Sequence, residues 1–253
     1  MDSIILPHLA TRKFEQALCD YTGAPFAVST SSCTMALLLA VAWHLKPHAN
    51  GNRMIYWWPD KSIYEIDEMT AKAKALNQEV RSEISTPKRT YVGVPMSILH
   101  AGGRPTFRDE DWRGAYQLKP LPVWDSARWF SAGMYGDITR NYHVANGKYV
   151  DTPGHGQFVC LSFHASKTLG DSQGGAILHD SPEADAWLRR ARFDGRAEGV
   201  APKDDTFAFA GWHCYLSPDV AARLLWKLSS LPRHNEPLEN DAYPDLSTME
   251  CFR

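Results

Sequence analysis

The chain has 253 residues, of which 44% are hydrophobic and 22% are charged, and its formal net charge is −2. This composition is typical of a globular protein that buries a substantial core. The near-balanced charge excludes a global basic field that would draw the protein to nucleic acid or to anionic lipid. No stretch approaches the roughly 20 apolar residues that cross a bilayer, and the N-terminal apolar run is too short for a secretory signal.

Two smaller features of the composition bear on location and partners. The five cysteines are odd in number and lack CxxC spacing, which argues against a disulfide framework or a zinc ribbon and favours reducing conditions. We therefore expect a cytoplasmic protein without a metal site. Arg189, Arg190, Arg192 and Arg196 are interspersed with acidic residues. We expect this arginine cluster to form a solvated helix face.

Apolar periodicity predicts helices and strands that alternate along the chain. In chain order we expect a helix over 12–23, a strand over 26–28, helices over 35–45 and 61–80, a strand over 83–86, a helical stretch ending at 100, strands over 105–108, 121–124, 158–163 and 175–179, and helices over 182–193 and 217–231. This alternation favours an α/β fold with a mainly parallel sheet flanked by helices. In such sheets, ligands gather at the carboxyl ends of the strands.

Polar residues with chemical potential follow three of the expected strands. The polar turn 29–34 joins a strand to an apolar helix, an arrangement that aims free backbone N–H groups and the helix dipole at an anion. Asp125 directly follows another strand, and Lys167 follows a third and precedes a Gly-Gly pair. Each feature has an ordinary explanation as an N-cap, a salt-bridge partner or a surface lysine. Their order along the chain points to one site.

The same segments carry a resemblance to a known family. They include YTGAPFAVSTSSCTMALL from residue 21, GGRPTFRDED from 102, WDSAR from 124, SFHASKTLGDSQGGA from 162 and GWHCYLSPDVAARLLWKLS from 211. In this order they resemble the sugar aminotransferases of the DegT/DnrJ/EryC1/StrS group, within the fold-type I pyridoxal-phosphate (PLP) enzymes. The resemblance extends over about half of the chain. It implies the large domain of that fold and pyridoxal 5'-phosphate as cofactor.

The resemblance implies two catalytic residues. Lys167 is expected to bind the cofactor aldehyde covalently through its amine and then to shuttle protons at the substrate's α carbon. Asp125 is expected to keep the pyridine nitrogen protonated, so that the ring accepts electrons from a carbanion. A surface lysine and a helix-capping aspartate are the alternatives.

The resemblance also implies the rest of a cofactor site. It places Ser32, Cys33, Thr34 and Ser162 at the cofactor phosphate, Tyr91 against the cofactor ring, and His213 at the phosphate of a neighbouring subunit. The last placement implies a homodimer with the active site at its interface. A core aromatic for Tyr91 and a surface histidine for His213 remain open alternatives.

Three residues of this site depart from the family pattern, and one of them is His213, which stands where the family usually has asparagine. Cys33 stands where the family has glycine, and Arg128 stands where it commonly has glutamine or histidine. Arginine presents a planar fork that suits carboxylates. We therefore expect Arg128 to bind the cofactor's phenolic oxygen or a substrate carboxylate, and an outward salt bridge is the alternative.

The domain organisation differs from the family pattern as well. We expect a single PLP-binding large domain over 1–253, with an insert at about 43–80 and a short C-terminal tail at about 232–253. The small domain is expected to be reduced or absent. A short connection between Asp109 and Asp125 further suggests that one sheet strand and one helix are missing.

These features lead to four functional hypotheses. The first is an aminotransferase that moves an amino group from an amino-acid donor to a keto substrate such as a nucleotide-linked keto-sugar. The second is a PLP-dependent decarboxylase or lyase that acts on a bulky substrate, such as an amino-acid-modified nucleotide or DNA base stacked on Trp57, Trp58, Trp129 or Trp212. The third is a non-catalytic descendant, which the retained lysine and aspartate argue against. The fourth, a plain nucleic-acid-binding module, is disfavoured by the charge balance.

Overall fold

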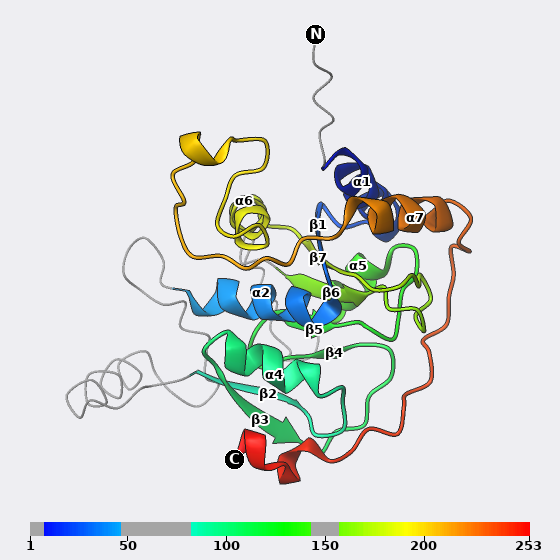
Figure 1. Cartoon of the computed structure of the whole chain (residues 1–253). Coiled ribbons are helices and arrows are strands. Elements are labelled where there is room, and N and C mark those ends of the chain that lie inside the picture. Colours follow the sequence, from blue (N-terminus) through cyan, green and yellow to red (C-terminus); the bar gives the residue numbers. More distant parts are fainter. Residues whose placement is uncertain (1–7, 47–81, 143–156) are drawn as a thin grey trace, which may run out of the picture.

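A central β-sheet lies between two layers of helices, as the α/β prediction requires (Figure 1). The computed structural model describes residues 8–46, 82–142 and 157–253. The expected helix at 61–80 and most of the 43–80 insert lie outside these described residues.

Every helix that the periodicity predicts within the described residues is present, with ends shifted by a few positions. The helices are α1 (Leu9–Thr22), α2 (Cys33–Leu45), α4 (Gly93–His100), α5 (Met134–Tyr142), α6 (Pro182–Ala191) and α7 (Pro218–Leu228). Gly23 ends α1 in the left-handed conformation, with a φ of 78°, as its position after the helix predicts. Among the described residues, no helix is long and apolar enough to cross a membrane.

The strands form two sheets. The larger sheet has the order β1-β7-β6-β5-β4, and β2 pairs with β3 in a separate parallel ribbon. The strands are β1 (Phe26–Thr30), β2 (Glu83–Pro87), β3 (Arg104–Arg108), β4 (Tyr116–Gln117), β5 (Val123–Asp125), β6 (Phe158–Ser162) and β7 (Gly175–His179). An isolated bridge between Ser85 and Lys119 connects the ribbon to the segment beside β4.

The prediction of a mainly parallel sheet is wrong for the described strands. Within the larger sheet only the β5–β6 pair is parallel, whereas β1–β7, β6–β7 and β4–β5 are antiparallel. A parallel neighbour needs a crossover connection, usually a helix. The link 163–174 between β6 and β7 contains turns and no helix, so β7 returns antiparallel to β6. Because β7 also pairs antiparallel with β1, this one reversed strand accounts for two of the three antiparallel pairs.

The alternation of side chains along the strands builds one core on each face of the sheet. Phe158 and Cys160 of β6 belong to the cluster under α2, α4 and α6. Val159 and Leu161, which point to the opposite face, belong to the cluster under α1, α5 and α7. The sheet is therefore buried on both sides, as a three-layer α/β architecture requires.

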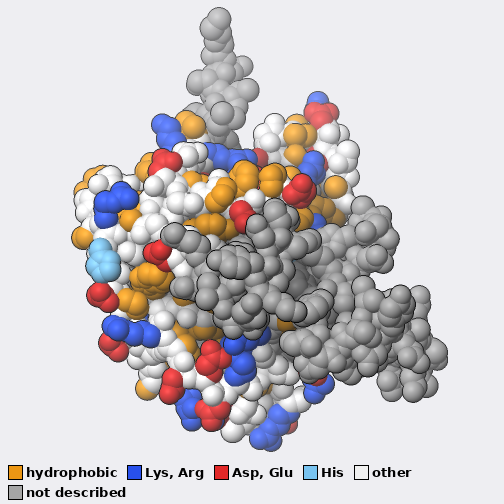
Figure 2. Space-filling view, turned by 180° about the vertical axis from the view of Figure 1, so that it is seen from behind, with side chains coloured by type: hydrophobic (Ala, Val, Ile, Leu, Met, Phe, Trp, Pro, Cys, Tyr) orange, Lys and Arg blue, Asp and Glu red, His pale blue; other side chains and the backbone are white. Residues whose placement is uncertain are grey.

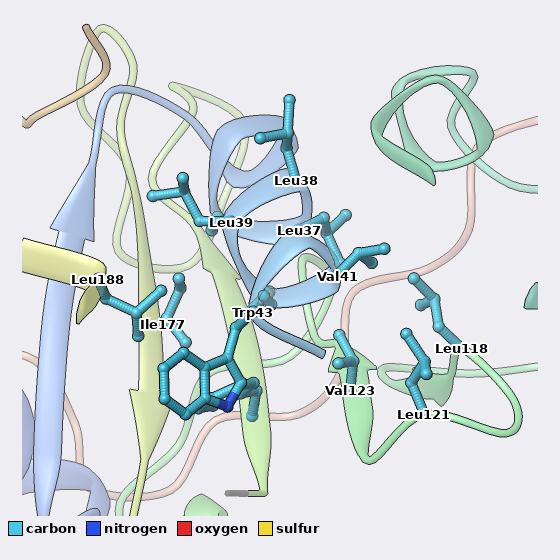
Figure 3. Packing of buried hydrophobic residues seen from close by; sticks show 14 of the residues in the cluster. Leu37, Leu38, Leu39, Val41, Trp43, Leu118, Leu121, Val123, Ile177 and Leu188 are labelled. Atoms are coloured by element: carbon cyan, nitrogen blue, oxygen red, sulfur yellow. The ribbon is translucent and has the colours of Figure 1, made fainter. Parts of the chain in front are cut away.

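Helix α2 is the most completely enclosed of the described helices. Its side chains from Ala36 to Val41 are at most 3% exposed. Figure 3 shows Trp43 beside Leu188 and Ile177, and Val41 on the side of the helix that faces Val123. An apolar helix that is buried on all sides is held by packing rather than by amphipathicity. This packing fixes the position of its first turn, which begins at Cys33.

The arginine cluster is not a solvated helix face, contrary to the expectation. Arg192 is completely buried, and its guanidinium donates to Glu15 at 2.5 Å, to the Ser29 carbonyl at 2.6 Å and to Glu198 at 2.8 Å. Arg189 donates to the other oxygen of Glu15 at 2.7 Å. The acidic partner lies on α1, far from the arginines in sequence, so local periodicity gave no sign of the pair. The network ties α1, β1 and α6 together.

The C-terminal tail over 232–253 packs against the body of the protein. Leu238 donates its backbone N–H to the Arg128 carbonyl at 2.8 Å, and Leu246 donates to Lys88 at 2.9 Å. The Leu246 side chain is fully buried. Figure 1 shows this segment in red, running from α7 down to β3. The tail therefore passes the sheet edge at which Asp125 lies.

Candidate functional site

Three strands that run in the same direction end at one edge of the sheet. β5 and β6 are parallel, and β1 runs in the same direction as β6 because β7 is antiparallel to both. Their last residues are Thr30, Asp125 and Ser162. The carboxyl ends of such strands are where ligands bind in α/β proteins. Asp125 and Ser162 end two of these strands, and the turn that contains Ser32, Cys33 and Thr34 follows the third.

The first turn of α2 forms one side of the site. Ser32 is its N-cap, and the Ser32 hydroxyl accepts the Met35 N–H at 3.2 Å. The N–H groups of Cys33 and Thr34 belong to the first turn, where a helix offers no backbone acceptor. Among the described residues other than glycine, only Asp194 and Phe207 have positive φ, so Cys33 does not need the conformational freedom of the glycine that it replaces.

Gly175 of β7 allows this turn to lie directly on the sheet. A Cβ atom at Gly175 would lie 2.4 Å from the Ser32 carbonyl carbon and 2.5 Å from the Cys33 nitrogen. Ser162, the last residue of β6, pairs with Gly175 in the antiparallel register. The Ser162 hydroxyl therefore lies on the strand beside the turn, where it also accepts the His164 N–H at 3.4 Å.

We expect Gly175→Ala to weaken phosphate or PLP binding at this turn at least about tenfold. The added methyl group meets rigid backbone, and overpacking of this kind costs about 1–3 kcal/mol, of which about 1.4 kcal/mol corresponds to a factor of ten. Titration of the variant with PLP, followed by absorbance, gives the dissociation constant. A folded variant, by circular dichroism, that binds as tightly as the parent would contradict the close packing.

Thr34 and Tyr91 meet on the next side of the site. A Cβ atom at Gly93, the first residue of α4, would lie 2.7 Å from the Thr34 Oγ1 and 2.7 Å from the Tyr91 ring. Tyr91 is 58% exposed. The expected alternative of a core aromatic is therefore excluded, and the Tyr91 ring presents a face to solvent beside the α2 turn.

Asp125 is a buried carboxylate with two protein donors. The Ala127 N–H donates to its Oδ1 at 2.9 Å, and the Tyr116 hydroxyl donates to its Oδ2 at 2.7 Å. The Thr90 hydroxyl lies 2.6 Å from the same Tyr116 oxygen and is placed to donate to it. Burial raises the pKa of Asp125, while these hydrogen bonds and the charge of Lys167 act in the opposite direction. A nearby cation would therefore stabilise the ionised form further.

Lys167 is held by a compact loop after β6. Its N–H donates to the His164 carbonyl at 2.9 Å, and a Cβ atom at Gly170 would lie 2.8 Å from the Lys167 carbonyl oxygen. The Lys167 side chain is half-buried. Burial and then the charge of Arg128 lower its pKa, and Asp125 partly offsets the effect. A lowered pKa increases the fraction of neutral, nucleophilic amine.

Helix α7 anchors this loop. Asp171 accepts from Arg223 Nη2 at 2.9 Å and from Lys227 Nζ at 3.0 Å, and Lys227 also donates to the Gly170 carbonyl at 2.6 Å. The segments that resemble the family around Lys167 and along α7 are thus in direct contact. This contact fixes the loop from which the Lys167 amine extends.

Arg128 and His213 differ in how they relate to the site. Arg128 acts electrostatically on Lys167, and its Nη1 donates to Asp241 of the tail at 2.8 Å. His213 is exposed and its ring contacts Asp194 at 2.7 Å. No described contact joins His213 to Lys167 or Asp125. A role at a neighbouring subunit stays a prediction for His213.

Sequence reasoning missed Tyr116, Asp241 and Tyr243. The Tyr243 hydroxyl donates to Asp241 at 3.2 Å, and the Arg128 and Asp125 charges both influence the pKa of Tyr243, which burial raises to about 12. Tyr116 lies on a two-residue strand, too short to show periodicity. The tail residues lie far along the chain from the catalytic candidates. No local pattern in the sequence marks any of these three positions.

The tryptophans that we weighed as base-stacking residues do not form a described stacking surface. Trp129 is half-buried and donates to the Asn235 carbonyl at 3.1 Å. Trp212 is half-buried too and packs edge-on against Trp187. Trp57 and Trp58 lie outside the described residues. On the face seen in Figure 2, basic side chains lie beside acidic ones instead of gathering into one basic patch.

Comparison with known proteins agrees with the resemblance noted in the sequence. The sequence model of the DegT/DnrJ/EryC1/StrS aminotransferase family matches residues 5–55. The uncharacterized protein MJ1066 of Methanocaldococcus jannaschii is 26% identical over 197 residues, which are 73% of this chain and 46% of that protein. The chain therefore spans about half the length of this curated relative.

Two solved structures share the fold. The sugar aminotransferase CalS13 from Micromonospora echinospora matches with a TM-score of 0.58 and 18% identity, over 88% of this chain and 61% of that chain. A putative PLP-dependent aminotransferase from Bacillus cereus matches with a TM-score of 0.53 and 14% identity, over 87% of this chain and 57% of that chain. The described elements therefore share the fold of part of these two chains, and the family model over residues 5–55 confirms the resemblance.

Proposed function

Since the chain is similar to the DegT/DnrJ/EryC1/StrS aminotransferases, we propose that it is a PLP-dependent aminotransferase. It moves an amino group from an amino-acid donor to a keto substrate, for which a nucleotide-linked keto-sugar is the leading candidate. One observation carries the proposal. Asp125, the last residue of β5, and Lys167, in the loop after the parallel strand β6, lie at one sheet edge, where the charge of each influences the pKa of the other.

The residues present fit the cofactor at both ends. The first turn of α2, closed by Gly175 and flanked by Ser162, offers N–H groups and hydroxyls to a phosphate. The buried Asp125 carboxylate suits a protonated pyridine nitrogen, because an adjacent cation lowers its pKa and offsets the penalty of burial. Tyr91, exposed beside Thr34, is available to stack on the ring.

Each side chain then has a defined task. Bound PLP supplies an electron sink for a carbanion next to the amino group. The Lys167 amine, whose lowered pKa favours the neutral form, would hold the cofactor aldehyde and would move a proton to and from the substrate carbon. Asp125 keeps a proton on the ring nitrogen, and Tyr116 holds the Asp125 Oδ2 in position. The loop contacts to α7 keep the Lys167 amine in reach.

A half-reaction tests this proposal directly. Adding L-glutamate or L-glutamine to the PLP-loaded protein is expected to convert the bound cofactor to its amine form, which shifts the absorption spectrum. D-glutamate serves as the control for non-specific effects. An unchanged spectrum with every L-amino donor, in a protein shown to hold PLP, would refute the aminotransferase.

A PLP-dependent decarboxylase or lyase is the second candidate, and Arg128 favours it. The guanidinium of the buried Arg128, whose charge acts on Lys167, has the planar fork that suits a substrate carboxylate. An amino-acid-bearing nucleotide or DNA base is the substrate to test. Release of CO₂ from such a substrate without a keto acceptor would support this candidate, and release that requires an acceptor would exclude it.

We further propose a homodimer as the active form. The support for this proposal is His213, a cofactor-binding candidate that is exposed and has no described contact with Lys167 or Asp125 of its own chain. Sedimentation velocity with and without PLP tests the assembly. A monomer that carries full activity would contradict the dimer.

A further inference from the structure

Arg128 is a buried guanidinium whose hydrogen-bonding capacity is only partly used. Its side chain is 9% exposed, and its Nη1 donates to Asp241 Oδ2 at 2.8 Å. Its Nε is buried and has no hydrogen-bond partner among the described residues. A buried donor without an acceptor is unfavourable. The Nε–H is therefore a donor that the described residues leave unpaired.

The geometry of the Arg128–Asp241 pair explains why Asp241 leaves the Arg128 Nε–H unpaired. A guanidinium binds a carboxylate best through two parallel N–H donors. Asp241 contributes one oxygen to Nη1, and that oxygen also accepts from the Tyr243 hydroxyl at 3.2 Å. The Asp241–Arg128 ion pair is thus monodentate. A carboxylate that takes the place of Asp241 is able to accept from two donors of the guanidinium at once.

The two partners differ in how firmly the protein holds them. Arg128 lies three residues after Asp125, in the turn that the buried Asp125 side chain stabilises through the Ala127 N–H. Asp241 lies on the tail, and its side chain is 65% exposed. One backbone hydrogen bond, from the Leu238 N–H to the Arg128 carbonyl, holds the tail nearby, so it is the exposed Asp241 side chain that is able to move. Arg128 is therefore the fixed partner, and Asp241 is the partner that can leave.

The pair also lies at the same sheet edge as the proposed reacting amine, because Arg128 follows β5 and Lys167 follows the neighbouring parallel strand β6. Arg128 and Asp241 both influence the pKa of Lys167, in opposite directions. A carboxylate bound to Arg128 would thus sit close to the Lys167 amine. An amino acid or an amino-acid-bearing substrate carries such a carboxylate next to its reacting carbon.

We propose that Arg128 is the recognition site for a substrate carboxylate, and that the Asp241 carboxylate binds Arg128 when no substrate is present. The inference rests on the proposed function for its substrate class. Ligand and tail compete for one guanidinium, so removal of the Asp241 charge strengthens carboxylate binding. Arg128 is the binding residue, and competition from Asp241 lowers the affinity of Arg128 for the substrate carboxylate.

Direct binding of glutarate to the full chain tests the competition without any turnover. Glutarate has carboxylates but neither an amine nor a keto group, so it binds without reacting. We expect Asp241→Asn to bind glutarate at least tenfold more tightly than the parent in calorimetric titration, and Arg128→Gln to lose the binding. Glu239→Gln is the matched control, because Glu239 is 89% exposed, pairs only weakly with Arg113 at 3.5 Å and lies on the same segment.

The outcomes separate this inference from the proposed function. Equal glutarate affinity in the parent and in folded Asp241→Asn overturns the inference, and so does a gain of the same size in Glu239→Gln. Glutarate binding that persists in folded Arg128→Gln overturns it as well. The proposed function fails independently if the parent never holds PLP, whatever the glutarate affinities are.

Discussion

Replacing Asp125 with asparagine is expected to lower the rate of the amino-group half-reaction by about 100-fold or more. Asparagine keeps the shape, but its single amide oxygen accepts only one of the two hydrogen bonds, because Tyr116 and Ala127 donate to different oxygens of Asp125. Asparagine also carries no charge with which to hold a proton on the ring nitrogen. Removing one partner of a buried charge pair costs on the order of 2–5 kcal/mol, and about 2.7 kcal/mol corresponds to a factor of 100. Stopped-flow absorbance with L-glutamate measures the rate.

Asp109 offers the matched control for this variant. It also follows a strand, but its side chain is 76% exposed and pairs with Lys88 at the surface. Asp109→Asn is expected to leave the rate within about twofold, because exposed ion pairs contribute little. Equal rates for Asp125→Asn and the parent would show that the buried carboxylate does not face the cofactor ring.

Replacing Glu15 with glutamine is expected to destabilise the fold by about 3–5 kcal/mol, because it leaves the buried Arg192 charge without its main partner. Urea unfolding at pH 7 measures the loss. Glu239→Gln, at an 89% exposed side chain, serves as the control and is expected to stay within about 0.5 kcal/mol of the parent. A similar small change for Glu15→Gln would contradict the network.

The same pair predicts how stability depends on pH. Burial alone would raise the pKa of Glu15, but Arg192 and Arg189 outweigh it and lower the pKa from 4.5 to about 2. A carboxyl group whose pKa is lowered by folding stabilises the protein above the unfolded value, and this contribution is lost as pH falls from about 4.5 to about 2. Parent and Glu15→Gln unfolding energies should therefore converge across this range. A constant difference would contradict the lowered pKa.

The sequence predicted the elements well where local rules decide them. β7 begins and ends at the predicted residues, and Gly23 closes α1 in the left-handed conformation that its position implies. The direction of β7 was predicted wrongly, because strand direction depends on the connection before it. The loop over 163–174 is long enough for a crossover connection but has no helical pattern. The missing helical pattern was the one sign in the sequence that β7 runs antiparallel to β6.

Long-range pairs explain the rest of what the sequence did not reveal. Arg192 looked like part of a charged surface because its partner Glu15 lies on another helix. Tyr116 and Asp241 approach Asp125 and Arg128 only in the folded chain. Motif order was enough to bring Lys167 and Asp125 into one hypothesis, since both follow strands. Tyr116 and Asp241 support the site through tertiary contacts, and they belong to no motif in the sequence that would have revealed them.

The identity of the amine that binds the cofactor is the most direct test of the account. The pure protein supplied with PLP is expected to absorb visible light, and borohydride reduction followed by peptide mass spectrometry is expected to locate the cofactor on Lys167. Lys167→Ala should neither show that absorption nor retain the label. A protein that stays colourless with PLP, or a label that is found on another lysine, would contradict the central claim.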